Sequence, residues 1–117
     1  MDLPAPLEAI RASLVDRYGK KFDSVGANLY RDGRDSVAWH GDRIAREIHN
    51  PIVATVSLGG RRRFLLRPHG GGRSHRFEPG KGDLLVMGGA CQRTWQHTVP
   101  KVASAGPRIS ITVRHSA

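Results

Sequence analysis

Apolar residues recur at helical spacing near the start of the chain and at roughly every second position after it. The helical part lies between two prolines, at positions 4 and 6, and Gly19. Its apolar positions, three or four residues apart, are Leu7, Ile10, Leu14 and Tyr18. This spacing, with proline at the start and glycine after the end, predicts one amphipathic helix over residues 6–18.

Seven later segments are short and rich in branched, aromatic and threonine residues, which favour strands. Glycine, proline and Asp-Gly turns separate them. The segments are Ser24–Tyr30, Ser36–His40, Ile52–Leu58, Arg62–Arg67, Asp83–Met87, Thr94–Val99 and Arg108–Arg114. About seven short strands after one helix indicate a mainly β protein, an antiparallel sandwich or jelly roll with its strands within 24–115 and the helix packed on it.

A length of 117 residues predicts a single domain, 1–117, with one modest core. The sequence has no apolar run approaching the roughly 20 residues of a membrane span, and its first residues lack the pattern of a secretory signal. We therefore expect a cytoplasmic protein without a membrane partner, and a monomer. Its single cysteine, Cys91, cannot form an internal disulfide or a thiolate zinc site alone.

The chain is strongly basic, with a net charge of +9 and a pI near 11.0. A basic surface attracts polyanions through its field and through counterion release, so nucleic acid is the expected partner. A bias toward arginine also arises from genome composition, and this alternative stays open. Six arginines around a glycine run either grip phosphates or form a solvated hairpin edge: Arg61, Arg62, Arg63, Arg67, Arg73 and Arg76.

The segment Trp39-His40-Gly41-Asp42 places an imidazole and a carboxylate two residues apart at the end of a predicted strand. Side chains at i and i+2 of extended backbone project from the same face, so both can reach one metal ion. His97, on another predicted strand, is the best candidate for a third ligand. Two histidines and one carboxylate are the ligand set of non-haem iron(II) oxygenases. The alternative is a chance His-x-Asp triplet on the surface.

Polar and apolar residues alternate without a break from Arg108 to Arg114. Arg108, Ser110, Thr112 and Arg114 therefore share one face of a strand. Guanidinium groups inside a barrel need acidic partners, and few carboxylates lie near them in the sequence. A small dicarboxylate bound between the arginines would satisfy them; the alternative is a polar outer face with solvated arginines.

Five motifs follow one another along the chain: Asn28-Leu29-Tyr30, Trp39-His40-Gly41-Asp42, Gly82-Asp83-Leu84-Leu85-Val86-Met87, Trp95-Gln96-His97 and the stretch from Arg108 to Arg114. In this order they resemble the AlkB family of Fe(II)- and 2-oxoglutarate-dependent dioxygenases, and the resemblance runs from about residue 7 to residue 115. The resemblance implies a double-stranded β-helix, with Fe(II) held by His40, Asp42 and His97. It also implies that 2-oxoglutarate is bound by Asn28, Tyr30, Arg108 and Arg114.

The activity implied by the resemblance is oxidative dealkylation of bases in DNA or RNA. Dioxygen and 2-oxoglutarate would be consumed, the alkyl carbon hydroxylated, and an aldehyde, succinate and CO2 released. The nucleic acid would be single-stranded or present a flipped base.

The chain departs from the family pattern in three places. Ser110 stands where members often have asparagine, and Ile44 stands where the bacterial prototype has an acidic residue. Only the predicted helix precedes Asn28 in this sequence, whereas members generally have a further N-terminal segment that folds as a lid over the nucleotide. Two alternatives follow: an oxygenase of the same chemistry that acts on a protein or small molecule, and a non-catalytic nucleic-acid-binding fragment.

Several other aromatic and imidazole residues have no motif around them. We expect Trp39 and Trp95 to lie in the core. The histidines without metal-ligand spacing are expected at the surface: His49, His69, His75 and His115.

Overall fold

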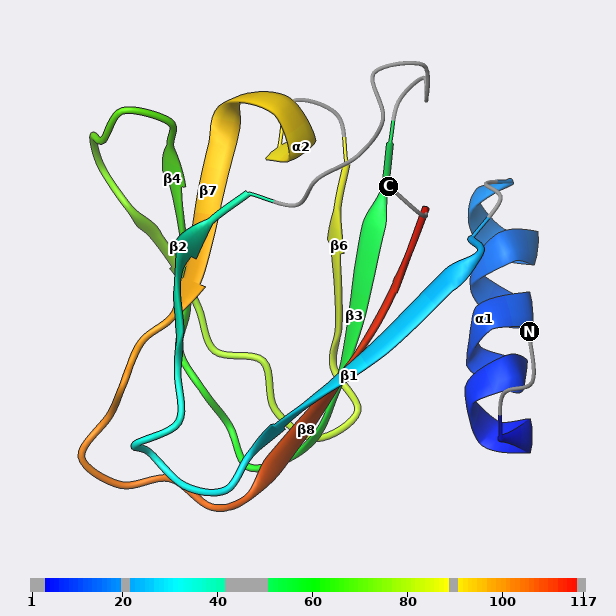
Figure 1. Ribbon diagram of the computed structural model, residues 1–117, viewed down its shortest axis with the longest axis horizontal. Coiled ribbons are helices and arrows are strands. Elements are labelled where there is room, and N and C mark those ends of the chain that lie inside the picture. Colours follow the sequence, from blue (N-terminus) through cyan, green and yellow to red (C-terminus); the bar gives the residue numbers. More distant parts are fainter. Residues whose placement is uncertain (1–3, 20–21, 42–50, 89–90, 116–117) are drawn as a thin grey trace.

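Two antiparallel sheets face each other, and one helix lies on the outer side of the first sheet (Figure 1). The computed structural model describes residues 4–19, 22–41, 51–88 and 91–115. The expected fold class, a mainly β double-stranded β-helix with one N-terminal helix packed on it, is confirmed. Within these residues, neither helix has the length and apolar character needed to cross a membrane.

The first sheet has the strand order β1-β8-β3-β6, all antiparallel. Its strands are β1 (Ser24–Tyr30), β8 (Arg108–Arg114), β3 (Val53–Gly59) and β6 (Leu84–Met87). The first and last residues of β1 and β8 are those predicted, because alternation in both strands ends at clear turn residues. Side chains that alternate along these strands face the helix on one side and the second sheet on the other.

The second sheet has the order β2-β7-β4-β5. It consists of β2 (Val37–His40), β7 (Trp95–Val99), β4 (Phe64–Pro68) and β5 (His75–Phe77), and the one-turn helix α2 (Cys91–Thr94) precedes β7. Neither β5 nor α2 was predicted. The strand β5 has only three residues, too few to show alternation, and α2 is too short to show a helical period.

Helix α1 (Ala5–Tyr18) begins one residue before the predicted boundary. It ends at Gly19, which adopts a left-handed conformation (φ 64°) and donates its N–H to the Val15 carbonyl. Glycine adopts this conformation without the steric cost of a side chain. Leu14 is the fully buried side chain of the helix.

Two apolar clusters hold the layers together. Leu14 and Phe22 pack on Ala54 and Val113 between α1 and the first sheet. The second cluster lies between the two sheets and consists of Tyr30, Val53, Phe64, Met87 and Val99. The fold thereby leaves the polar inner positions of β1 and β8 beside an apolar wall.

The expected places of some aromatic and imidazole side chains need correction. Trp39 and Trp95 are half-buried and belong to neither cluster. Trp39 packs against the Arg67 guanidinium, 3.8 Å from Cζ to ring centre, and Trp95 packs against the ring of His75. His115 is buried rather than exposed, since its ring packs 5.4 Å from that of Phe22 behind α1. His69 and His75 are exposed as expected, and His49 lies outside the described residues.

Candidate active site between the two sheets

A cavity of about 260 Å³ lies between the sheets. Its size is close to the lower end of small-molecule sites, about 300 Å³. The inner face of the first sheet gives it a polar wall that includes Asn28, Tyr30, Arg108, Ser110, Thr112 and Arg114. The prediction that the four polar residues of β8 share one face is confirmed, and that face lines the cavity rather than facing the solvent.

The antiparallel register places Tyr30 opposite Arg108 and Asn28 opposite Ser110. At the other end of the pair, Arg114 lies opposite Ser24, and both line the cavity. Tyr30 and Arg108 are almost fully buried, with exposed fractions of 4% and 3%. The four residues expected to bind 2-oxoglutarate are therefore brought to one cavity from two neighbouring strands.

The guanidinium group of Arg108 is buried with incomplete hydrogen bonding. Its Nη2 donates to the Ser57 hydroxyl at 2.9 Å, whereas Nε and Nη1 are buried and have no hydrogen-bond partner among the described residues. Burial lowers the pKa of Arg108, the Tyr30 hydroxyl acts in the opposite direction, and the nearby charge of Arg62 adds to the lowering. An arginine nevertheless stays protonated in proteins, so this is a buried cation that lacks an anion.

Such a group fits a carboxylate ligand. Buried charges in proteins are normally paired or hydrogen-bonded, because an unpaired charge in a low-dielectric interior is costly. Two guanidinium nitrogens still have N–H groups to donate, and charge-assisted hydrogen bonds from arginine to a carboxylate are strong. Among the described residues, no carboxylate hydrogen-bonds to Arg108.

His40 and His97 come together on the opposite wall of the cavity. They are direct partners in the β2–β7 pair, and their ring centres are 4.3 Å apart. His97 is 8% exposed and stacks on Phe64, with 5.2 Å between ring centres. The sheet therefore brings together two imidazoles that are far apart in the sequence.

A backbone contact selects the tautomer of the neutral His40 ring. Its Nδ1 lies 2.8 Å from the Ala38 carbonyl oxygen, and a carbonyl can only accept, so Nδ1 carries the hydrogen. The lone pair is then on Nε2, as in metal-binding histidines whose other ring nitrogen donates to a carbonyl. The donor chemistry of this pair fits a divalent transition metal.

Asp42, the expected carboxylate ligand, lies outside the described residues, as does Ile44. Within the described part of the chain, no group of three histidine, cysteine or acidic residues is placed to hold a metal. Asp42 therefore stays a prediction from its position two residues after His40.

Sequence reasoning missed two hydroxyl residues of β3. Ser57 is the acceptor for Arg108, and Thr55 lies 3.3 Å from Thr112, oxygen to oxygen. Both line the cavity. The signal was present, because they alternate with Ala54, Val56 and Leu58 in an otherwise apolar strand and must therefore face the opposite side.

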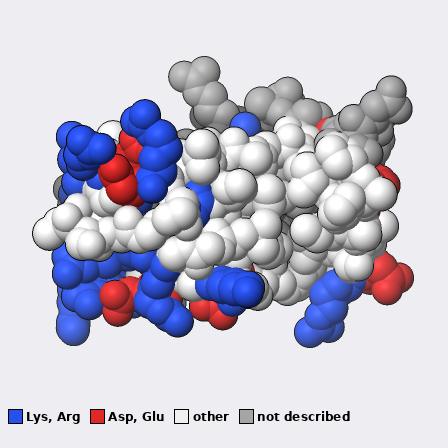
Figure 2. All heavy atoms as spheres, turned by 90° about the horizontal axis from the view of Figure 1, so that it is seen from below, with Lys and Arg blue, Asp and Glu red and all other residues white. Residues whose placement is uncertain are grey.

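The arginines around the glycine run differ in their exposure to solvent. Arg62 is buried, with an exposed fraction of 2%, so it belongs neither to a phosphate grip nor to a solvated edge. Arg61, Arg63, Arg73 and Arg76 are exposed. Viewed from below, basic side chains gather mainly at the end of the molecule that carries the second sheet, with acidic side chains among them (Figure 2).

The chain is similar to known proteins in sequence. The profile of the 2OG-Fe(II) oxygenase superfamily matches residues 1–114. Alpha-ketoglutarate-dependent dioxygenase alkB homolog 3 of Bos taurus is 38% identical over 115 residues, a match that covers 90% of this chain and 40% of that protein. DNA oxidative demethylase ALKBH2 of Arabidopsis thaliana is 33% identical, with 97% of this chain and 44% of that protein covered. The chain thus spans less than half the length of these relatives.

Solved structures share the fold. The structure of OsALKBH1 superposes with a TM-score of 0.69 at 19% identity, covering 95% of this chain and 60% of that one. A Pseudomonas putida prolyl-4-hydroxylase superposes with a TM-score of 0.55 at 17% identity, covering 97% of this chain and 63% of that one. Together with the sequence matches, these findings establish that the chain belongs to the 2OG-Fe(II) oxygenase superfamily, within which it is an AlkB homologue.

Proposed function

We propose that this chain binds Fe(II) and 2-oxoglutarate and oxidatively dealkylates alkylated bases in DNA or RNA. The observation that carries the proposal is the buried Arg108 guanidinium, two of whose nitrogens lack a partner, in the same cavity as the paired imidazoles of His40 and His97. Arg108 can bind an anion and the two imidazoles can bind a metal ion, so the cavity suits a ligand that is both a carboxylate and a metal chelator.

In this proposal Arg108 binds the distal carboxylate of 2-oxoglutarate through its unpartnered N–H groups, while the Ser57 hydroxyl accepts from Nη2. The Tyr30 hydroxyl adds a donor beside it. Arg114 and Asn28, which also line the cavity, act on the end of the molecule nearer the metal. Arg108 and Arg114 lie six positions apart on β8, on the same wall of the cavity.

His40, His97 and Asp42 would hold the iron. When bound, Fe(II) with dioxygen supplies the oxidising chemistry that the side chains themselves lack. The residues around it have simpler tasks. The Ala38 carbonyl holds His40 in the tautomer that leaves Nε2 free, and Phe64 holds the plane of His97. Val53, Met87 and Val99 form an apolar wall that limits water in the cavity.

Nucleic acid is the proposed substrate on two grounds. The net charge of +9 attracts phosphates, and a relative that matches almost the whole chain is named a DNA oxidative demethylase. The proposed substrate is therefore DNA or RNA.

The test is incubation with Fe(II), ascorbate, 2-oxoglutarate and single-stranded DNA or RNA carrying N-methylated bases. We expect succinate and formaldehyde in equal amounts with methylated strands, and no formaldehyde with unmethylated strands of the same sequence. Succinate without formaldehyde would move the substrate to a protein or small molecule. Neither product, together with DNA binding that weakens steeply with salt, would leave a non-catalytic binding fragment.

A further inference from the structure

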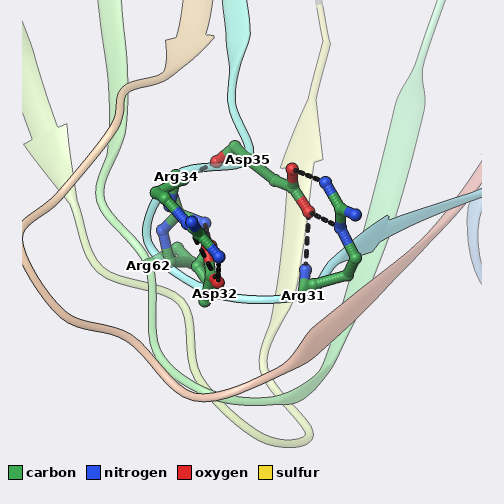
Figure 3. Close-up of polar contacts among 5 residues, drawn as sticks. All are labelled: Arg31, Asp32, Arg34, Asp35 and Arg62. Carbon is green, nitrogen blue, oxygen red and sulfur yellow. Dashed lines mark hydrogen bonds and ion pairs between the residues drawn. The ribbon is translucent and has the colours of Figure 1, made fainter.

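Arg62 is fully buried in the connection between β3 and β4 and binds backbone atoms of two other loops. Its Nη2 donates to the carbonyls of Asp35 at 2.8 Å and Pro100 at 2.7 Å. Its Nη1 donates to the carbonyl of Asp32 at 3.2 Å. Figure 3 shows the Arg62 side chain within the turn that contains Asp32 and Asp35. One cation therefore joins three connections at one end of the molecule.

The turn that Arg62 holds follows directly on Tyr30. Two ion pairs stiffen it, from Arg31 to Asp35 and from Arg34 to Asp32 (Figure 3). Val102, in the β7–β8 connection, donates its N–H to Gly33 at 2.9 Å, and a Cβ on Gly33 would collide with the Val102 carbonyl. The backbone after Tyr30 is thus fixed against the loop that follows β7.

Arg62 also contacts the Tyr30 side chain itself. Its Cζ lies 5.3 Å from the centre of that ring, and the Cζ of Arg108 lies 4.9 Å from the same centre. Two guanidinium groups therefore share one phenol ring, within the range of cation–π attraction. The charge of Arg62 is also close enough to lower the pKa of Arg108.

We propose that Arg62 is a positioning residue for 2-oxoglutarate: it fixes Tyr30 beside Arg108 and adds a second positive charge near the carboxylate end of the cavity. The inference rests on the proposed function. A residue that only held the loops together would give stability and nothing else. A residue that sets the place of Tyr30 and the local potential also sets the affinity for the dianion, because both act on the group that receives its distal carboxylate.

The experiment compares the whole chain with Arg62→Met, Arg62→Lys and the matched control Arg63→Met, whose arginine is the exposed neighbour. For each, the Kd for 2-oxoglutarate is measured by calorimetry with Mn²⁺ in place of Fe²⁺, well below the thermal midpoint. We expect unchanged affinity in Arg63→Met and a Kd about tenfold higher in Arg62→Met, because that variant loses the second positive charge and the contact that fixes Tyr30. Arg62→Lys should fall between them, since it keeps the charge without the planar fork.

Folded Arg62→Met with wild-type affinity and a lowered thermal midpoint would overturn the proposal and leave a purely structural arginine. Should Arg62→Met fail to fold, Arg62→Lys decides: wild-type affinity there overturns the proposal, and a weakened affinity at an unchanged midpoint supports it. Absence of 2-oxoglutarate binding in the wild-type chain would instead count against the proposed function, so the two failures are distinct.

Discussion

Arg108 and Tyr30 are direct cross-strand partners on β8 and β1, and the guanidinium carbon lies 4.9 Å from the centre of the phenol ring. The ring packs against a buried guanidinium group, two of whose nitrogens have no hydrogen-bond partner among the described residues. Packing against an aromatic face stabilises a guanidinium without using its hydrogen-bond donors. The pair therefore keeps a charge in the interior and leaves it able to bind.

Arg108→Met should separate stability from ligand binding. Loss of a charge-assisted contact is expected to weaken 2-oxoglutarate binding by about 1.5–3 kcal/mol, roughly ten- to a hundredfold in Kd. The ligand-free protein should be as stable as wild type or more so, because an apolar chain replaces an incompletely paired buried charge. Thermal melts with and without 2-oxoglutarate measure both effects. A ligand-induced rise in the variant equal to that of wild type would contradict the assignment.

Ser57→Ala should weaken 2-oxoglutarate binding without removing it. The change leaves a third guanidinium nitrogen of Arg108 without its acceptor, and the side chain becomes free to turn away. We expect a loss of about 1 kcal/mol in binding free energy, typical of one hydrogen bond. Calorimetric titration measures it, and Ser104→Ala, at an exposed serine, is the control that should match wild type.

His97→Ala should reduce metal binding by at least the roughly 10–100-fold known for changes around metal ligands. His40→Ala should do the same, since the two rings lie side by side. Titration with Mn²⁺ followed by magnetic resonance gives the affinity directly. His69→Ala, which removes an exposed histidine, serves as the control. Unchanged metal affinity in His97→Ala would remove that residue from the ligand set.

Leu14→Ala should destabilise the fold by about 2–5 kcal/mol, as usual for a large-to-small change in a core. Leu14 is the buried side chain of α1 and packs on Phe22, Ala54 and Val113. Urea unfolding measures the difference. Ser13→Ala, at an exposed position on the same helix, should change the midpoint little, and an equal loss in both variants would argue against a role for this contact.

Asp35→Asn should lower the thermal midpoint at neutral pH and have less effect in acid. The hydrogen bonds from the Arg31 side chain and N–H hold the pKa of Asp35 well below its usual value. A depressed pKa gives stability that is present above the unfolded value, about 3.9, and is lost as the pH falls toward the folded one. The difference between variant and wild type should therefore narrow below about pH 4. It should also shrink in high salt, because the pair is exposed.

The alternation of polar and apolar residues by itself determined the strands that build the site. It put Arg108, Ser110, Thr112 and Arg114 on one face, because a side chain's face in a strand depends only on its position along that strand. The bounds of β1 and β8 followed from strand-favouring residues and the turn residues beside them. The family resemblance added the expectation that His40 and His97 belong together. The face on which a strand residue lies is a local property, which can be read without knowing which strands are neighbours.

Tertiary structure decided what those faces meet. Only the register of β3 against β8 brings Ser57 to Arg108, and only the meeting of three connections buries Arg62 on the carbonyls of Asp32, Asp35 and Pro100. In the sequence, Arg62 is one of three consecutive arginines with nothing to distinguish it from its neighbours. Burial of a charge depends on partners that are distant along the chain, and the residues next to Arg62 in the sequence do not identify them.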